Sequence, residues 1–546
     1  MAHFYHFNFH SSIGHHGPKR TLKRDSEKEA PKVTTPAAGT LETASEILAH
    51  QTTKRILHRV DLRLVPILSL LYLLCFLCRQ NIGNAKIFHM TNDLHLTTQQ
   101  YQIALTAFFF SYSTFDIPCN VMLKKLRPSV WLPLVTLLSG VVTVCMGVVK
   151  NADELIVVRM FLGMTECGLF PGVAYVITMW YCKKEAQFRQ ALFFCAASMA
   201  GAFAGLLAVI LSKMDGLGGQ EGWRWILIIE GLLTVVVAIC AFFIVLDTPE
   251  RAKFLTKDEK EFLLRRLEVD QFGEEEDELT EAEKAQIHTD LPSSQIFKSV
   301  FTDWHIYAHI LVFYGISCPL YSISLCLPSI VKELGYTSTQ ANFLTVPIYI
   351  TACLLSLSTA YLSDRTGKRA VFIAISYTTM FTGFLIAALR PGHLPGLAYA
   401  GMFIAACGVY PAFPGMITWC SNNLASSGKR AIAMALHIGM GSFGGAMGAN
   451  FYRAQDKPLY RLGHWLNLGF VCLGGVAIAV IYFSYRMENK RRGCVCARLA
   501  EELEKGIEKA GRGTEEGEKL RREFVVRREE SLAHEGDRSV WFRYMM

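Results

Sequence analysis

The sequence predicts an all-helical membrane protein (an all-α membrane protein) with twelve transmembrane helices in two parallel six-helix repeats. Three observations support this fold class. Of the 546 residues, 51% are hydrophobic and only 19% are charged, whereas charged residues make up about a quarter of a typical soluble protein. The apolar residues gather in runs of about twenty, the length that crosses a hydrocarbon core. The second half of the chain also repeats motifs of the first half.

The apolar runs come in two sets of six. They lie at 62–85, 100–123, 130–149, 154–180, 189–211, 223–246, 304–331, 341–363, 370–389, 396–420, 430–451 and 464–486. The segment between the sets contains "EEEDELTEAEK", which is too polar to cross a membrane. The expected organisation is a disordered N-terminal tail (1–60), a six-helix bundle (61–246), a linker (247–303), a second six-helix bundle (304–486) and a charged C-terminal tail (487–546).

Basic residues in the short loops set the expected orientation. Those that fall on one side of the membrane are Lys124, Lys125, Arg127, Lys183, Lys184, Arg365, Lys368, Arg369, Lys429 and Arg430. The positive-inside rule places this side, the linker and both tails in the cytoplasm. The net charge of +8 therefore reflects membrane topology and not a nucleic-acid partner. The 16 cysteines are mostly single residues in apolar runs, without metal-ligand spacing.

The internal repeat relates helices of the two halves. "GLFPGVAYVITMW" (168–180) is answered by "PAFPGMITW" (411–419), so the fourth run corresponds to the tenth. The glycine-rich runs 190–205 and 430–445 also align, which pairs the fifth run with the eleventh. Small residues at these positions let helices approach closely. Two such repeats around a central cavity are the architecture of secondary transporters.

Positions where the repeat breaks are candidates for chemistry. Glu166 stands opposite Val409, about 11 residues or roughly 16 Å into its run. A carboxyl group at that depth is either a proton carrier or a structural hydrogen-bonding group. Arg159, two turns before Glu166, either biases that carboxyl or extends to the membrane interface, and we expect the second. His437 stands opposite Ala197 and is either a core histidine or a group that binds protons or substrate.

Arg79 ends the apolar stretch "LLYLLCFLCRQNIGNAK" (70–86). A guanidinium in the bilayer costs about 2.5–3.5 kcal/mol on insertion scales. Facing a cavity, it would offer a fork suited to a carboxylate; near a helix end, it would reach the headgroups. A polar face that includes Asn81 and Asn84 favours the cavity. Tyr314 and Tyr321, on the seventh run, either stack on a substrate ring or are core aromatics. The expected substrate-binding residues are Arg79, Asn81, His437, Tyr314 and Tyr321.

The loop "AYLSDRTGKR" (360–369) predicts a conformational latch. Asp364, at a helix end, can hold basic residues against the neighbouring bundle in one state and release them in another. The basic residues concerned are Arg365, Lys368 and Arg369. The corresponding loop of the first half (116–131) lacks this pattern, but Asp116 can still pair with basic residues there.

Several motifs together carry a family resemblance: "CRQNIGNAK", "IPCNVMLKKLRPSVW", "RMFLGMTECGLFPGVAYVITMWY", "GWRWILIIEG", "DRTGKR", "YPAFPGMITW", "NFYRAQDKPLYRLGH" and "WFRYM". Over residues 50 to about 490 the chain resembles the fungal anion:cation symporters of the major facilitator superfamily, in the branch of the allantoate and high-affinity nicotinic acid permeases. The resemblance implies proton-coupled uptake of small organic anions across the plasma membrane, with Arg79 binding the substrate carboxylate and Glu166 exchanging the proton. The chain departs from the family in having Cys78 where members often have Asp, and His437 where they often have Gln.

We therefore expect a symporter for a small organic carboxylate such as nicotinate or an allantoate-like anion, active as a monomer, with no cofactor, metal or nucleic acid. Glu166 and His437 are the expected proton-coupling residues. Two alternatives remain open, a nutrient-sensing receptor with little flux and a proton-driven efflux carrier. An enzyme is not expected, because the sequence offers no nucleophile–base set, metal-ligand spacing or phosphate-binding loop.

Overall fold

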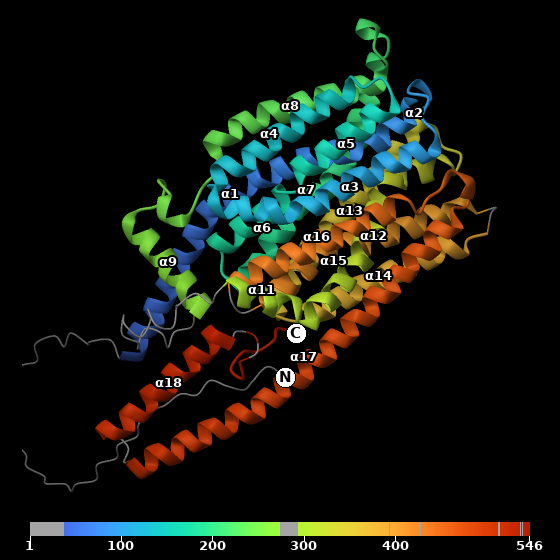
Figure 1. The fold of residues 1–546 in the computed structure, drawn as a ribbon. Helices are drawn as coiled ribbons and strands as arrows, with labels where there is room; N and C mark the ends of the chain where they lie inside the picture. Colours follow the sequence, from blue (N-terminus) through green and yellow to red (C-terminus); the bar gives the residue numbers. More distant parts are fainter. Residues whose placement is uncertain are drawn as a thin grey trace, which may run out of the picture. The chain divides into compact units, whose positions relative to one another are not determined.

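The computed structural model describes residues 38–272, 293–391, 394–424, 427–510, 514–535, 537 and 539–546. Every regular element in these ranges is a helix (Figure 1). The chain divides into two compact units, Met1–Leu57 and His58–Met546. Residues 38–57 of the first unit are helical, and the site described below lies wholly within the second unit.

The helices fall into an earlier and a later set. The earlier set is α1 (Ala38–Ile87), α2 (Met90–Asp93), α3 (Thr98–Lys125), α4 (Pro128–Gly147), α5 (Ala152–Glu166), α6 (Leu169–Trp180), α7 (Lys183–Leu211) and α8 (Gly222–Ile244). Between the sets lie α9 (Lys257–Phe272) and α11 (Ser293–Phe301). The later set is α12 (Trp304–Lys332), α13 (Ser338–Thr366), α14 (Arg369–Leu389), α15 (Pro395–Asn422), α16 (Ser427–Ala449), α17 (Arg461–Ala510) and α18 (Glu515–Glu535). The 3-10 turns η1 (Ser212–Met214), η2 (Leu217–Gly219), η3 (Pro249–Arg251) and η5 (Ala454–Asp456) join helices.

Eleven helical spans in the described ranges are long and apolar enough to cross a membrane. They match eleven of the twelve predicted runs. The run predicted at 100–123 forms helix α3, which has the length but is not among the eleven. Its polar side chains explain the difference, because α3 buries Ser111, Ser113 and Asp116 inside the protein. Large apolar side chains such as Phe243 and Val236 are exposed, as lipid-facing positions require.

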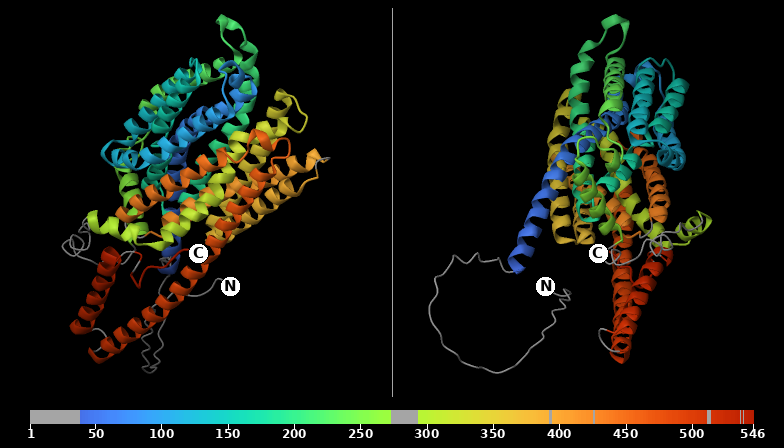
Figure 2. Two further views of the ribbon diagram at one scale, coloured as in Figure 1. Left: turned by 45° about the vertical axis from the view of Figure 1, so that its right-hand side comes forward. Right: turned by 90° about the vertical axis from the view of Figure 1, so that its left-hand side faces the viewer.

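Helices pack chiefly within their own set, α4 on α8 and α3 on α5 in the earlier set, α14 on α15 and α12 on α16 and α17 in the later one. The two sets meet where α7 packs on α13 and α3 packs on α16. Figures 1 and 2 show this arrangement, with the blue-to-green helices beside the yellow-to-red ones. The boundaries predicted for the two six-helix bundles stay a prediction.

Close helix approach at α3 and α5 depends on a glycine. A Cβ added to Gly163 would lie 2.2 Å from the carbonyl oxygen of Phe108. The run predicted at 154–180 is not one continuous helix, because α5 ends at Glu166 and α6 begins at Leu169. Pro171 accounts for this break, since it has no amide hydrogen to donate to the carbonyl of Cys167. The break leaves Glu166 at a helix end inside the protein.

Helices extend into both predicted tails. Helix α1 begins at Ala38, so residues 38–60 of the predicted N-terminal tail are drawn as helix, and the disorder of that tail stays a prediction. Residues 40–60 contain no proline and many strong helix formers, which favours a helix there. Helix α17 continues past the predicted end of the last run to Ala510. The predicted calls on residues 1–37 and 273–292 lie outside the described residues.

The end of the chain packs against the later helices. We call Asp537 and residues 539–546 the C-terminal strap. Tyr544 stacks on Tyr485 of α17, with ring centroids 4.2 Å apart and planes 7° apart. The indole nitrogen of Trp419 donates to the Met545 carbonyl at 2.9 Å. The strap therefore lies across the end of the later set that includes the start of α12 and the end of α15.

Candidate functional site

Arg79 and Glu166 form a buried ion pair between α1 and the end of α5. The Nε and Nη2 atoms of Arg79 each lie 3.0 Å from Oε2 of Glu166. The side chains are 5% and 0% exposed, so water screens the pair very little. The other oxygen, Oε1 of Glu166, has no hydrogen-bond partner. The guanidinium fork is thus directed at a single carboxylate oxygen, and one acceptor site remains unused.

Aromatic rings enclose the Arg79 guanidinium. Its Cζ atom lies 5.1 Å from the centroid of Phe108 and 4.8 Å from that of Tyr112, both on α3. Nη1 of Arg79 donates to the hydroxyl of Tyr321 at 2.8 Å. Because Tyr321 is on α12, the two sets of helices meet at this guanidinium. Rings around a desolvated cation stabilise it by cation–π attraction. Of the predicted substrate-binding residues, the structure brings Arg79 and Tyr321 together.

Arg159 lies on the same aromatic ring as Arg79. Its Cζ is 5.5 Å from the centroid of Phe108, and the residue is only 1% exposed. The expectation that Arg159 extends to the membrane interface is therefore wrong, because packing between α3 and α5 encloses it. Its Nε and Nη1 atoms have no hydrogen-bond partner. With Glu166 ionised, Arg79, Arg159 and Glu166 carry one net positive charge.

A small cavity of about 10 Å³ lies between α1, α7, α12 and α13. Its lining is Gln80, Gly83, Asn84, Gly201, Ala204, Gly205, Ser324, Leu325, Pro328, Thr345 and Tyr349. Gln80 follows Arg79 in the chain, and its Nε2 atom has no hydrogen-bond partner. A Cβ on Gly83 would lie 2.8 Å from the Leu325 carbonyl oxygen, so α1 and α12 are in backbone contact here. The cavity thus lies where helices of both sets converge.

Asn81 points away from the Arg79 fork. Its Nδ2 atom donates to Oε2 of Glu230 on α8, and Asn81 is 0% exposed. Cys78, one residue before Arg79, contacts the hydroxyl of Thr234 on α8, at 3.6 Å. The structure thus places Asn81 in a second buried polar group, on the α8 side of α1, and its predicted role in substrate binding stays a prediction.

His437 and Tyr314 lie in other surroundings than Arg79. The Nε2 atom of His437 is 2.9 Å from Sδ of Met416. The centroid of the His437 ring lies 5.1 Å from that of Phe313. Its second nitrogen, Nδ1, has no hydrogen-bond partner. Tyr314 is half-buried against a core group that includes Val300, Ile306 and Ala433. The structure therefore does not bring these two predicted residues to the guanidinium, and their roles stay predictions.

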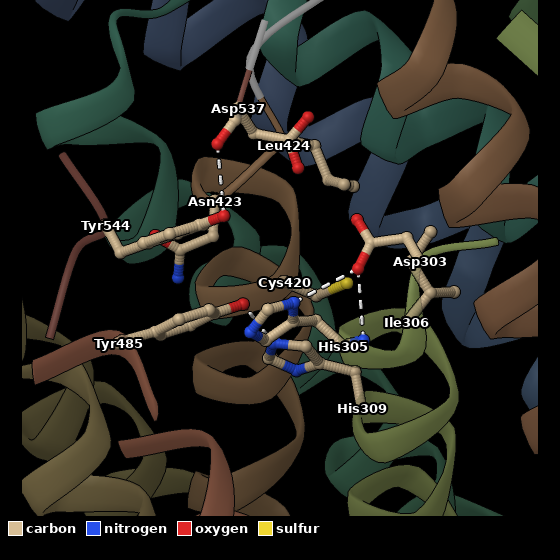
Figure 3. A pocket seen from close by; sticks show the side chains of 10 residues that line it. All are labelled: Asp303, His305, Ile306, His309, Cys420, Asn423, Leu424, Tyr485, Asp537 and Tyr544. Atoms are coloured by element: carbon tan, nitrogen blue, oxygen red, sulfur yellow. Dashed lines mark hydrogen bonds and ion pairs between the residues drawn. The ribbon is translucent and has the colours of Figure 1, made fainter. Parts of the chain in front are cut away.

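A charged cluster that joins the strap to the start of α12 was not predicted; Figure 3 shows Asp303, His305 and Asp537 of this region. Nζ of Lys429 lies 2.7 Å from carboxylate oxygens of both Asp303 and Asp537. Asp303 also accepts from the backbone and ring nitrogens of His305 at 3.1 Å. Burial alone would raise the pKa of Asp303, but the hydrogen bond from His305 and the charge of Lys429 hold that pKa below its ordinary value. Burial raises the pKa of Asp537, although Lys429 pairs with it.

The residues of the predicted latch lie at the boundary of the two sets. Oδ2 of Asp364 accepts from the backbone amide of Phe188 on α7 at 2.8 Å, and Oδ1 is 3.5 Å from Nη2 of Arg369. Arg365 and Lys368 are exposed. Asp116 is 0% exposed, and its Oδ2 would lie 3.3 Å from a Cβ on Gly439 of α16. Asp364 and Asp116 thus each lie where the sets meet, and their action as a latch stays a prediction.

Sequence reasoning assigned no role to several residues of the site. Glu230 could have been found, because it is the one acidic residue within the apolar helix α8, Gly222–Ile244. Phe108 and Tyr112 give no such signal, since α3 contains many aromatic residues. The cavity-lining Tyr349 and the strap contacts depend on tertiary packing and leave no periodic pattern.

Comparison with known proteins gives the family. The sequence profile of the Major Facilitator Superfamily matches residues 68–449. The MFS transporter prlL of Fungal sp. (strain NRRL 50135) is 35% identical over 456 residues, covering 82% of this chain and 90% of that protein. The high-affinity nicotinic acid transporter of Saccharomyces cerevisiae is 29% identical over 454 residues, covering 83% and 82% of the two chains.

A solved structure shares the fold. It is a bacterial homologue of the human lysosomal transporter Spinster in an inward-facing, unoccupied conformation, with a TM-score of 0.55 and 16% identity. The likeness covers 77% of this chain and 95% of that one. The matched proteins are membrane transporters and not enzymes, which agrees with the apolar helices and the interior charged site. The chain belongs to the Major Facilitator Superfamily and is a multi-pass membrane transporter.

Proposed function

We propose that the protein is a proton-coupled symporter that takes up a small organic carboxylate, of the kind represented by nicotinate or an allantoate-like anion. In this proposal it belongs to the anion:cation symporters, works as a monomer in the plasma membrane, and has both termini in the cytoplasm. The similarity to a nicotinic acid transporter supports the substrate class. Basic loops at one end of the helices support the orientation.

The observation that carries the proposal is the buried Arg79–Glu166 pair. Glu166 occupies the donor fork that a substrate carboxylate would need, so the two carboxyl groups compete for one guanidinium. Protonation of Glu166 removes its charge and weakens its hold on Arg79. Arg79 is then available to a substrate anion, and a proton and a carboxylate are taken up together.

The charge of Arg159 supports an anionic substrate. When Glu166 is protonated, two buried guanidiniums lie on the ring of Phe108 without a counter-ion. Such an arrangement is costly unless an anion enters. The cavity of about 10 Å³ between α1, α7, α12 and α13 has room for about one water molecule, so in this proposal the helices that line it must part before a small ring compound can enter. Alternating access follows as the two sets of helices rock about this site.

Uptake assays test the proposal. Cells that lack their own permeases express the full chain and receive labelled nicotinate, allantoate or pantothenate at pH 5 and pH 7, with and without an uncoupler. We expect one acid to accumulate at pH 5 and to lose accumulation with the uncoupler. Arg79→Gln and Glu166→Gln should each reduce that accumulation at least tenfold, whereas the exposed controls Arg127→Gln and Glu250→Gln should not.

Other outcomes contradict the proposal. Normal uptake by Arg79→Gln would place the substrate site elsewhere. Binding without accumulation would favour a receptor, and loss of preloaded substrate driven by an inward proton gradient would favour an efflux carrier. Uptake that ignores the uncoupler would exclude proton coupling.

A further inference from the structure

Glu230 is a second buried carboxyl group in the membrane-spanning part of the chain. It lies near the middle of α8 and is 2% exposed. Oε2 accepts a hydrogen bond from Nδ2 of Asn81. Oε1 of Glu230 and Oδ1 of Asn81 are both buried, and neither has a hydrogen-bond partner. Two acceptor oxygens therefore lack a donor in one side-chain pair.

No cation compensates Glu230 within the described residues. Arg79 lies two residues from Asn81 but pairs with Glu166. The titratable group that faces Glu230 from α1 is the thiol of Cys78. Helix α4 and residues 191–211 of α7, which pack on α8, contain no Asp, Glu, Lys or Arg. On α8 itself, Arg224 lies in the first turn, six residues before Glu230, and it pairs with Glu221.

An ionised carboxylate in this position would be buried without a counter-charge, which is strongly unfavourable. A proton on Oε1 removes the charge. It also supplies the donor that the pair lacks, because a carboxylic acid and an amide can each donate to the other. The burial of this pair and its two acceptor oxygens without a donor thus fit the acid form of Glu230.

Helix α1 connects this pair to the Arg79–Glu166 pair. Arg79 and Asn81 are two residues apart, and each holds a carboxyl group of a different helix. A movement of α1 that brings Arg79 from Glu166 to a substrate must also change the contact of Asn81 with Glu230. The two carboxyl groups are therefore linked through one rigid helix.

We propose that Glu230 is a second proton-binding residue of the transport cycle, protonated while Asn81 contacts it and deprotonated when α1 parts from α8. In the second state the O–H bond of Glu230 breaks and its proton passes to water admitted between the helices. This inference rests on the proposed symport function. With Glu166, it gives two protons for each substrate, so a monocarboxylate crosses with one net positive charge.

Net charge movement gives a direct test. The full-length protein is reconstituted into vesicles with equal pH on both sides, and labelled nicotinate is the probe. When one positive charge accompanies each substrate, an inside-negative potential of about 59 mV raises equilibrium accumulation about tenfold. We expect the wild type and the exposed control Glu250→Gln to show this response. Glu230→Gln should lose it and still take up nicotinate when a pH gradient is imposed.

An infrared measurement reports on the proton itself and needs no substrate. Wild-type protein at pH 7 should show the carbonyl stretch of a protonated carboxyl group that is absent from Glu230→Gln. Asn81→Ala keeps the acid and should shift this band, which covers the case in which Glu230→Gln does not fold. A wild type without a voltage response, a voltage response retained by Glu230→Gln, or an infrared band unaffected by both substitutions would overturn the proposal. If nicotinate is not transported at all, the proposed function fails for this substrate, and the infrared band still decides whether Glu230 carries a proton.

Discussion

The charge balance around Phe108 can be tested by a cycle of substitutions at Glu166 and Arg159. Glu166→Gln keeps an acceptor oxygen for Arg79 but removes the only negative charge of the three-residue cluster. The side chains of Arg79 and Glu166 are 5% and 0% exposed, so solvent does not weaken the attraction between them appreciably. Breaking a buried ion pair by removing one partner costs about 3–5 kcal/mol. Because Gln preserves the hydrogen bond, we expect a loss near the lower end, about 3 kcal/mol.

A second substitution should restore part of the lost stability. In the Glu166→Gln background, Arg79 and Arg159 are both positive and share the ring of Phe108. Adding Arg159→Gln removes this repulsion, and we expect the double variant to recover about 1–2 kcal/mol, within the range of couplings between contacting residues. Unfolding of the purified protein in detergent at pH 7.5, followed by tryptophan fluorescence in a denaturant series, measures each corner of the cycle. If Glu166→Gln is as stable as the wild type and Arg159→Gln rescues nothing, Glu166 is uncharged in the folded protein, and the ion-pair argument is refuted.

Five further substitutions, at four positions, test packing and charge elsewhere. Gly163→Ala puts a Cβ 2.2 Å from the carbonyl oxygen of Phe108. We expect thermal unfolding to show that the free energy of unfolding falls by about 1–3 kcal/mol. Unchanged stability would mean that α3 and α5 can separate freely. Lys429→Met leaves two buried carboxylates facing each other and should cost about 3–5 kcal/mol, with faster proteolysis of the strap, whereas Asp537→Asn keeps the Asp303 pair and should cost about 1 kcal/mol. Equal effects of these two would contradict the shared-lysine geometry. Asp364→Asn keeps an acceptor for the α7 amide but removes the negative charge beside the buried Arg369, and should cost about 1–3 kcal/mol in the same unfolding assay. Asp364→Ala removes both contacts and should cost more.

Helix positions follow directly from the sequence because lipid leaves the backbone little choice. An apolar run that enters a bilayer must satisfy its own backbone hydrogen bonds, so each run becomes a helix. The break after Glu166 does not follow from hydropathy alone; it also depends on Pro171, which has no amide hydrogen to donate. Helix α3 also forms where the sequence predicts it, but it is not among the eleven apolar spans because several of its polar residues are buried inside the protein.

The candidate site was only partly accessible to sequence reasoning. The internal repeat singled out Glu166, but it could not show that Arg79, which is 87 residues away in the chain, is its partner. The same comparison singled out His437, which lies against Met416 and Phe313 and not beside Arg79. Comparing the two repeats shows where their residues differ, but it does not show which residues lie close together in the fold. Glu230 was missed although a carboxyl group in an apolar helix is a chemical signal by itself. Partners on separate helices are fixed by packing, which a single sequence does not encode in any local pattern.

The strap has a consequence for the order in which the protein is assembled. Asp537 reaches Lys429 across a separation of 108 residues. At synthesis rates of about 5–20 residues per second, Lys429 is made roughly 5–20 s before this partner exists. During that interval Asp303, which precedes it in the chain, is the only one of its two carboxylates already made. The later helices are therefore made before the residues that cover this end of them, and the Lys429–Asp537 contact closes last.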